Sequence, residues 1–166
     1  TLEYLRTIPH LRVRTRSFEA VFAVRDQLAQ AVHQYFHSHG YRYVHAPIIT
    51  GSDCEGAGEM FRVTTQPWTT DAKTEEEYFA EDFFGRKAGL TVSAQLEGEM
   101  AAMGLGRIYT FGPTFRAEHS NTTRHAAEFW QIEPEVCFAD INDIIGIAED
   151  FIKSIIPSVL ENCPDE

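Results

Sequence analysis

Hydrophobic residues recur at helical spacing along the segment from 17 to 39. A helix of this kind presents one apolar face, because residues three and four positions apart lie on the same side. Ser17 is placed to cap its start, and Gly40 is placed to follow its end. A short strand over 41–44 then runs into Pro47. The apolar positions of the predicted helix are Phe18, Val21, Phe22, Leu28, Val32, Tyr35 and Phe36.

A strict two-residue alternation marks the segment from 107 to 138, which predicts two strands joined by a polar loop. Each strand has one apolar face suited to a core and one face that carries charge. The charged face combines Thr110, Gly112, Thr114, Arg116 and Glu118 with Phe129, Gln131, Glu133 and Glu135. The apolar face combines Tyr109, Phe111, Pro113 and Phe115 with Trp130, Ile132, Val136 and Phe138. A solvent-exposed hairpin with ordinary ion pairs fits the alternation as well.

The other patterns complete an α+β arrangement. A strand is predicted over 90–94 and a helix over 96–103 that ends at Gly104. A second long helix begins at the N-cap Asp140, and Pro157 is expected to kink or end it. The segment 51–59 mixes glycines with acidic residues and reads as a flexible loop, and 66–82 reads as a polar surface excursion. Strands, an antiparallel hairpin and helices in this order predict an α+β domain built on an antiparallel sheet.

Composition limits the kinds of binding partner and the cellular compartment expected for the chain. The chain has 166 residues, 43% of them hydrophobic, and a net charge of −11. Residues 1–47 carry six Arg against three acidic residues, whereas the remainder carries 8 basic and 22 acidic residues. This balance excludes a nucleic-acid-binding surface that covers the whole domain. No membrane span or secretion signal is visible, and three lone cysteines without CxxC spacing favour a reducing cytoplasm.

The strings FGPTFRAE, SNTTRHAAEFW and EPE within 107–138 resemble motif 2 of the class II aminoacyl-tRNA synthetases, in the subgroup for aspartate, asparagine and lysine. The helix, strand and proline of 17–47 resemble motif 1, which forms much of the dimer interface in that family. The resemblance implies the family's antiparallel catalytic fold with flanking helices. An ordinary amphipathic helix over a core explains 17–47 equally well from the pattern alone.

The resemblance also assigns roles in binding ATP. Arg116 corresponds to the family's motif 2 Arg and is the predicted catalytic residue, because its planar fork can hold phosphate oxygens. Glu118 is similar to the residue that holds the adenine end, and Arg124 and His125 to contacts of the γ-phosphate. Phe129 is predicted to stack on adenine, and its place on the charged face argues against a packing role.

The predicted amino-acid-binding residues are Glu55, Ser93, Gln95 and Glu133. In the related aspartyl enzymes a Lys follows the Gln of this stretch by three residues, and that position is Gly98 here. A carboxylate at Glu133 without that Lys favours an asparagine side chain over an aspartate. Glu135 is the tentative ligand for Mg²⁺, or else a hydrogen-bonding residue of the scaffold. The implied partners are therefore ATP, Mg²⁺, asparagine, tRNA(Asn) and a second copy of the chain.

The resemblance covers almost all of residues 1–166 but only the first part of a synthetase catalytic domain. The family's anticodon-binding barrel and its motif 3 have no counterpart in this sequence. We therefore expect a fragment of a longer enzyme, which leaves open whether the isolated chain is active. The alternative is a non-catalytic or tRNA-independent paralogue that dimerises and binds a nucleotide or an amino acid.

Overall fold

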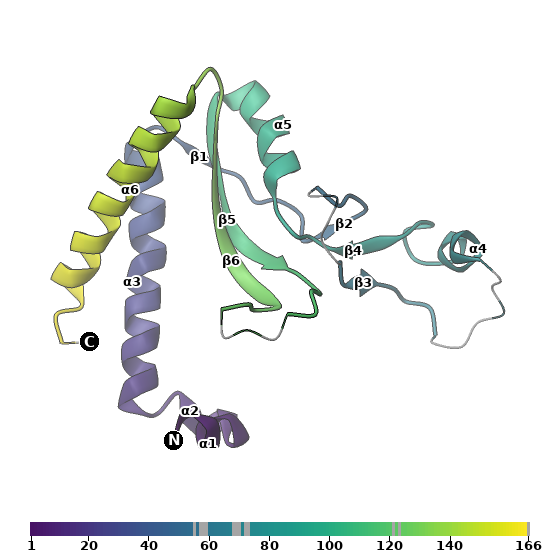
Figure 1. Ribbon diagram of the computed structural model, residues 1–166, viewed down its shortest axis with the longest axis horizontal. Coiled ribbons are helices and arrows are strands. Elements are labelled where there is room, and N and C mark those ends of the chain that lie inside the picture. The colour runs from purple at the N-terminus through teal and green to yellow at the C-terminus, as the bar shows by residue number, and fades with distance from the viewer. Residues whose placement is uncertain are drawn as a thin grey trace. The chain divides into compact units, whose positions relative to one another are not determined.

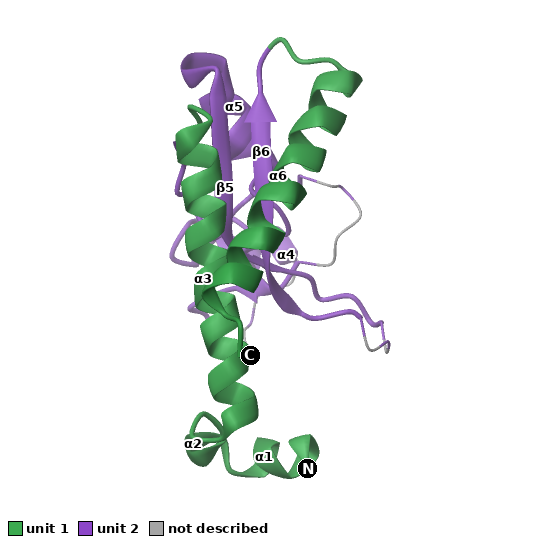
Figure 2. Ribbon diagram, turned by 90° about the vertical axis from the view of Figure 1, so that its left-hand side faces the viewer, with its two compact units in different colours: residues 1–41, 138–166 green, residues 42–137 purple. Residues whose placement is uncertain are grey.

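The computed structural model describes residues 1–54, 56, 60–67, 71, 74–120, 122 and 124–165. They form two compact units (Figure 2): residues 1–41 with 138–166, and residues 42–137. Among the described residues, no helix combines the length and the hydrophobicity needed to cross a membrane. The predicted α+β class is confirmed, because helices and largely antiparallel strands both occur.

The first unit is helical. It contains α1 (Leu2–Thr7), α2 (Pro9–Arg12), α3 (Arg16–Ser38) and α6 (Ile141–Asn162) (Figure 1). Aromatic rings join the two long helices: Phe151 of α6 lies 5.2 Å from both Tyr35 and Phe36 of α3, measured between ring centroids. The Tyr35 hydroxyl donates to Asp150 Oδ2 at 3.1 Å. Burial and this hydrogen bond raise the pKa of Tyr35 to about 12.

The predicted boundaries of α3 need one correction. The helix begins at Arg16 with Thr15 as the N-cap, not at Ser17, because the amides of Phe18 and Glu19 both bond to the Thr15 carbonyl. Its C-terminal end is as predicted, with Gly40 at a φ of 78° after the C-cap His39. Only the second half of the predicted apolar face is buried, at Val32, Tyr35 and Phe36, whereas Val21, Phe22 and Leu28 are exposed.

Helix α6 is capped as predicted but is longer than predicted. Asp140 accepts bonds from the amides of Asn142 and Asp143, and the Asp143 carboxylate accepts from the Asp140 amide, which completes a capping box. Pro157 does not end the helix, which continues to Asn162. A proline removes one backbone donor, and the helix keeps its later bonds, such as that from the Cys163 amide to the Val159 carbonyl at 2.8 Å.

The second unit contains two small sheets. Strands β1 (Arg42–Tyr43), β5 (Arg107–Phe115) and β6 (Glu128–Val136) form one sheet in the order β1-β5-β6. Strands β2 (Ile49–Thr50), β4 (Ala88–Leu90) and β3 (Arg62–Val63) form the other in the order β2-β4-β3. All pairs are antiparallel except β1 with β5, which run parallel and depart from the predicted antiparallel sheet.

Four features of this unit also differ from the prediction. Strand β4 ends at Leu90, so 91–94 is not a strand, and α4 (Glu75–Ala80) is a helix within the predicted surface excursion. Helix α5 (Gln95–Leu105) passes through Gly104 and ends at Gly106, whose φ of 82° suits glycine. Phe138 follows the end of β6 in a turn, with a φ of 63° and a fully exposed side chain, so it does not belong to an apolar strand face.

The β5–β6 hairpin is covered at one end by α5, and this defines where a site can lie (Figure 1). Ile108 and Tyr109 have no exposed surface, although successive residues of a strand point to opposite faces. The hairpin is therefore covered on both faces near its start. Toward Phe115 and Glu128 its partly exposed side chains leave surface available for a ligand.

Candidate functional site

The hairpin register places the predicted charged side chains on one face. Residues that lie directly opposite each other in an antiparallel pair point to the same side of the sheet. Thr110 faces Glu133, Gly112 faces Gln131 and Thr114 faces Phe129. Beyond the last strand pair, the Arg116 amide donates to the Ala127 carbonyl at 3.0 Å, so Arg116 continues the same ladder.

An open groove of about 490 Å³ lies at the loop end of this face. All five residues predicted to bind ATP line it together. The Arg116 guanidinium carbon lies 5.5 Å from the centre of the Phe129 ring, within reach of a cation–π interaction. The complete lining consists of Arg116, Glu118, Ser120, Arg124, His125, Ala126, Ala127 and Phe129.

Local hydrogen bonds shape the loop that carries two of these residues. His125 Nδ1 bonds to the Thr122 hydroxyl, and the Arg124 amide donates to the same oxygen at 3.3 Å. Both side chains are exposed, whereas Arg116 and Phe129 are half-buried. The groove therefore combines fixed groups on the hairpin with cationic groups on a solvent-facing loop.

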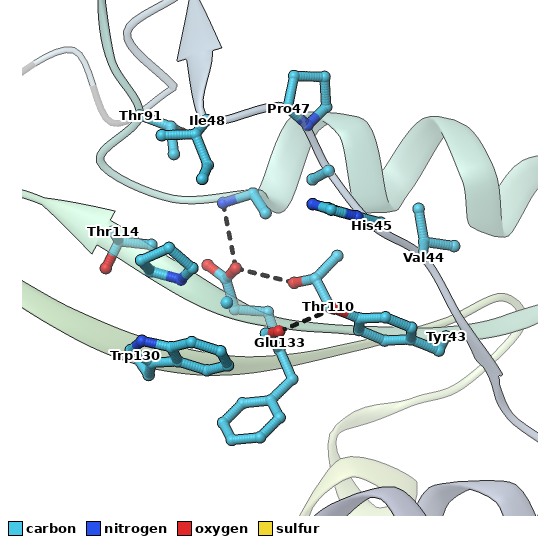
Figure 3. A pocket seen from close by; sticks show the side chains of 15 residues that line it. Tyr43, Val44, His45, Pro47, Ile48, Thr91, Thr110, Thr114, Trp130 and Glu133 are labelled. Atoms are coloured by element: carbon cyan, nitrogen blue, oxygen red, sulfur yellow. Dashed lines mark hydrogen bonds between the residues drawn. The ribbon is translucent and has the colours of Figure 1, made fainter. Parts of the chain in front are cut away.

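A second, smaller cavity of about 160 Å³ lies on the hairpin between β5, β6 and the segment from Tyr43 to Ile48 (Figure 3). Glu133 is the charged residue of its lining and points its carboxylate toward Thr110 (Figure 3). The Thr110 hydroxyl donates to Glu133 Oε2 at 3.0 Å, and the Ala94 amide donates to the same oxygen at 3.1 Å. The Ser93 hydroxyl donates to the other oxygen, Oε1.

Thr91 connects this carboxylate network to the groove around Arg116. Its hydroxyl donates to the Ser93 carbonyl at 2.6 Å, and its own carbonyl accepts from the Phe115 amide at 2.8 Å. Its amide donates to the Ile48 carbonyl, also at 2.8 Å. Because Phe115 directly precedes Arg116, one buried threonine links the stretch around Ser93 to the predicted phosphate-binding arginine.

The predicted amino-acid-binding residues are only partly brought together. Ser93 and Glu133 touch, and the Gln95 amide donates to the Ser93 hydroxyl at 3.1 Å. The Gln95 side chain instead donates to Glu99 at 2.9 Å and is exposed. Glu55 lies outside the residues that the structure describes.

Glu135 lies under helix α5 rather than in either cavity described above. A Cβ atom at Gly98 would lie 3.1 Å from Glu135 Cγ and 3.4 Å from Ile108 Cδ1, so the absence of a side chain lets α5 approach the hairpin. Burial raises the pKa of the Glu135 carboxyl, and the charges of Glu99 and Glu133 raise it further. Within the described ranges, no three His, Cys, Asp or Glu side chains gather as metal ligands.

The sequence did not single out Thr91, Thr110 or Gln131. Thr110 and Thr91 are both buried and bond to residues of the predicted site. Gln131 lies between Phe129 and Glu133 on the same face, and its buried Oε1 has no hydrogen-bond partner among the described residues. Alternation placed Thr110 and Gln131 on this face without giving them a role, and only the register shows which residues they contact.

The family model for class II tRNA synthetases (D, K and N) matches residues 2–166. The chain belongs to this family, and the resemblance to class II synthetases is thereby confirmed. Curated relatives of the chain include asparagine–tRNA ligases. That of Porphyromonas gingivalis is 59% identical over 168 residues, and that of Geobacter sulfurreducens is 59% identical over 170 residues. In both cases the alignment covers 100% of this chain and 36% of the relative, so the chain spans about a third of their length.

Solved structures agree with this assignment. The crystal structure of asparaginyl-tRNA synthetase from Pyrococcus horikoshii complexed with asparaginyl-adenylate has a TM-score of 0.83 at 29% identity. The match covers 99% of this chain and 34% of that one. The Entamoeba histolytica asparaginyl-tRNA synthetase, at 23% identity and a TM-score of 0.79, shows the same fold.

Proposed function

We propose that this chain is part of an asparagine–tRNA ligase, which activates asparagine with ATP and transfers it to tRNA(Asn). The observation that carries the proposal is the single groove that collects Arg116, Glu118, Arg124, His125 and Phe129. The names of the relatives support asparagine as the amino acid and favour an enzyme over a non-catalytic paralogue.

The proposed first step joins asparagine to AMP. A carboxylate oxygen of asparagine attacks the α-phosphorus of ATP and forms a new P–O bond. The bond from that phosphorus to the bridging oxygen breaks, and pyrophosphate leaves with the electron pair. In the second step, a terminal ribose hydroxyl of the tRNA attacks the acyl carbon and forms an ester bond. The bond from that carbon to the phosphate oxygen breaks, AMP leaves with the electron pair, and the hydroxyl proton is released to solvent.

Arg116 is the group that this chain offers to the reacting phosphate. Negative charge spreads over the phosphate oxygens in the transition state, so fixed donors and orientation account for most of the catalysis. Arg116 follows directly from β5 and is held by the Ala127 carbonyl, which keeps its position defined. Phe129 beside it is proposed to stack on adenine, and Glu118 is proposed to contact the adenine end. Arg124 and His125 are proposed to contact the γ-phosphate.

Glu133 is the proposed selector of the amino-acid side chain, with Ser93, Gln95 and Glu55 as the other contacts. A carboxylate accepts about four hydrogen bonds, and three positions of Glu133 are already occupied by protein donors. One position is therefore left for the amide NH₂ of asparagine. An aspartate side chain would instead bring a second carboxylate, and such like-charge contacts are costly in a partly buried pocket.

Among the described residues, no three His, Cys, Asp or Glu side chains gather as ligands for a metal ion. Glu135 stays the tentative Mg²⁺ ligand, because one or two carboxylates together with the phosphates of ATP can hold this ion. Burial and the charges of Glu99 and Glu133 raise the pKa of Glu135. No step is therefore assigned to a metal held by this chain alone, and Mg²⁺ is proposed to arrive with ATP.

Homodimerisation is proposed through motif 1, that is, α3 and the strand β1. The exposed side chains of Val21, Phe22 and Leu28 support it, since they form an apolar stretch on one helix. Phe22→Glu in the whole protein should shift sedimentation from dimer to monomer at micromolar concentration, with Gln34→Glu as an exposed control on the same helix. A monomeric wild-type protein would contradict the proposal.

The three free cysteines support a cytoplasmic location.

The test of the function is ATP–pyrophosphate exchange by the whole protein that carries this sequence. We expect exchange that depends on asparagine and is far weaker with aspartate, followed by charging of tRNA(Asn). The isolated 166-residue chain is assayed in parallel to show whether it retains any part of the activity. Exchange that is absent with asparagine, or equal with aspartate, would contradict the proposed function.

A further inference from the structure

Thr110 is buried directly beneath the carboxylate proposed to select the amino acid. Its side chain is 3% exposed, and it faces Glu133 in the hairpin register. Its hydroxyl donates to Glu133 Oε2 at 3.0 Å (Figure 3). The position of this hydroxyl is set by the sheet, because cross-strand partners on one face are held at a fixed separation.

Helix α5 passes close to this part of the hairpin. A Cβ added at Gly98 of α5 would lie 3.9 Å from Thr110 Cγ2 and only 3.1 Å from Glu135 Cγ, so a side chain at this position would crowd the hairpin. The bond to Glu133 Oε2 directs the Thr110 hydroxyl at the carboxylate.

The three donors to Glu133 come from two different parts of the unit. Ser93 and Ala94 belong to the loop between β4 and α5, whereas Thr110 belongs to the same hairpin as Glu133. Thr110 and Ala94 share one oxygen, so the loss of Thr110 would leave the carboxylate held mainly from the loop side. The carboxylate would then be free to turn toward the loop.

From this geometry we propose that Thr110 is a positioning residue for amino-acid selection, acting through Glu133. This inference rests on the proposed asparagine activation. Thr110 acts by fixing the carboxylate so that the unoccupied acceptor position faces the substrate amide. Hydrogen bonds to a charged group are among the stronger ones in proteins, so the removal of one should be measurable.

The decisive variant is Thr110→Val in the whole protein, because valine keeps the shape and removes the hydroxyl. We expect KM for asparagine to rise about tenfold, equivalent to about 1.4 kcal/mol. The ratio of kcat/KM for asparagine to kcat/KM for aspartate should fall. KM for ATP should stay within about twofold of the wild-type value. Thr110→Ser retains the hydroxyl and should restore both the asparagine KM and the ratio.

Thr114→Val is the matched control. Thr114 lies on the same strand and face and is equally buried, but its hydroxyl donates to the Phe129 carbonyl at 3.3 Å instead of to Glu133. Any loss from placing valine in this strand should appear in both variants, whereas a change in the asparagine-to-aspartate ratio should appear only at Thr110. Thr110→Ala provides the same loss of hydroxyl with a smaller side chain if the valine variant does not fold.

The outcomes are separable. If the wild-type protein activates asparagine and Thr110→Val or Thr110→Ala leaves the amino-acid ratio unchanged, the positioning role is wrong and the proposed function stands. If Thr114→Val changes the ratio as much as Thr110→Val does, the effect is general packing and the role is also wrong. If the wild-type protein does not activate asparagine, both proposals fail together.

Discussion

The two ends of the β5–β6 hairpin face are built differently. At the Glu133 end, a carboxylate is held by three protein donors and lines a cavity of about 160 Å³. At the Arg116 end, the charged groups border an open groove of about 490 Å³, and Arg124 and His125 are solvent-exposed. One end is organised before any ligand arrives, whereas the other still presents exposed cations.

The difference matches the ligands proposed for each end. A small, neutral side chain must be distinguished from an anion of almost the same shape, and this requires a carboxylate of fixed orientation. A triphosphate instead carries enough charge to attract mobile cations, and only its reacting phosphate requires a fixed donor. Changes at the Glu133 end should therefore alter selectivity, and changes at the Arg116 end should alter rate and ATP affinity.

The largest effect is expected from Arg116→Ala. Loss of a donor that acts on developing charge typically costs about 3–4 kcal/mol, which is a decrease of about 100- to 1000-fold in rate. ATP–pyrophosphate exchange in the whole protein should fall by this factor while circular dichroism stays native. Arg107→Ala, at the opposite end of the same strand, is the control and should exchange normally. Near-normal exchange by Arg116→Ala would remove its phosphate role.

Glu133→Gln should produce the next largest effect, and it should affect selectivity. The amide nitrogen of glutamine repels the asparagine NH₂ or displaces the Ser93 hydroxyl that now donates to Oε1. We expect kcat/KM for asparagine to fall about 100-fold, which corresponds to about 2.7 kcal/mol. The difference in kcat/KM between asparagine and aspartate should narrow. The measurement compares both amino acids in wild type and variant. An unchanged ratio would show that the selector lies elsewhere.

Phe129→Leu tests the proposed stacking of adenine at the groove end. Stacking between a base and an aromatic ring is worth about 1–3 kcal/mol, so KM for ATP should rise about tenfold. KM for asparagine should stay near its wild-type value, because Phe129 lines only the groove among the two cavities. A fall in Tm with both KM values unchanged would instead assign Phe129 to packing.

The smallest effect is expected at Glu135, in the stability of the fold. Burial, Glu99 and Glu133 raise its pKa above the ordinary value of 4.5, so the folded state disfavours the ionised form. Ionisation therefore removes stability as pH rises through the unfolded and then the folded pKa. Glu135→Gln should raise Tm at pH 7. The gain should disappear at about pH 4, where the Glu135 carboxyl of the wild-type protein becomes protonated. Glu128→Gln, at an exposed position of the same strand, is the control for the substitution itself.

The sequence pattern was enough to predict the hairpin and the side chains on each of its faces. Alternation depends only on the geometry of a strand, so it placed Arg116, Phe129 and Glu133 on one face without knowledge of their neighbours. Capping chemistry is equally local, which explains why Asp140 and Gly40 were placed correctly. The strings around Arg116 were long enough to identify the family, and the match to residues 2–166 confirms it.

Contacts between residues distant in the sequence depend on tertiary packing. Alternation does not give register, so the contact of Thr110 with Glu133 could not be derived from the pattern. The segment 91–94 carries residues suited to a strand, yet its backbone follows the side-chain bonds of Thr91 and Ser93 instead. The burial of α3 depends on where α6 packs, and Pro157 is tolerated because the rest of α6 keeps its bonds. Each of these outcomes depends on contacts between residues distant in sequence or on the hydrogen bonds of a whole helix. A local sequence pattern contains neither.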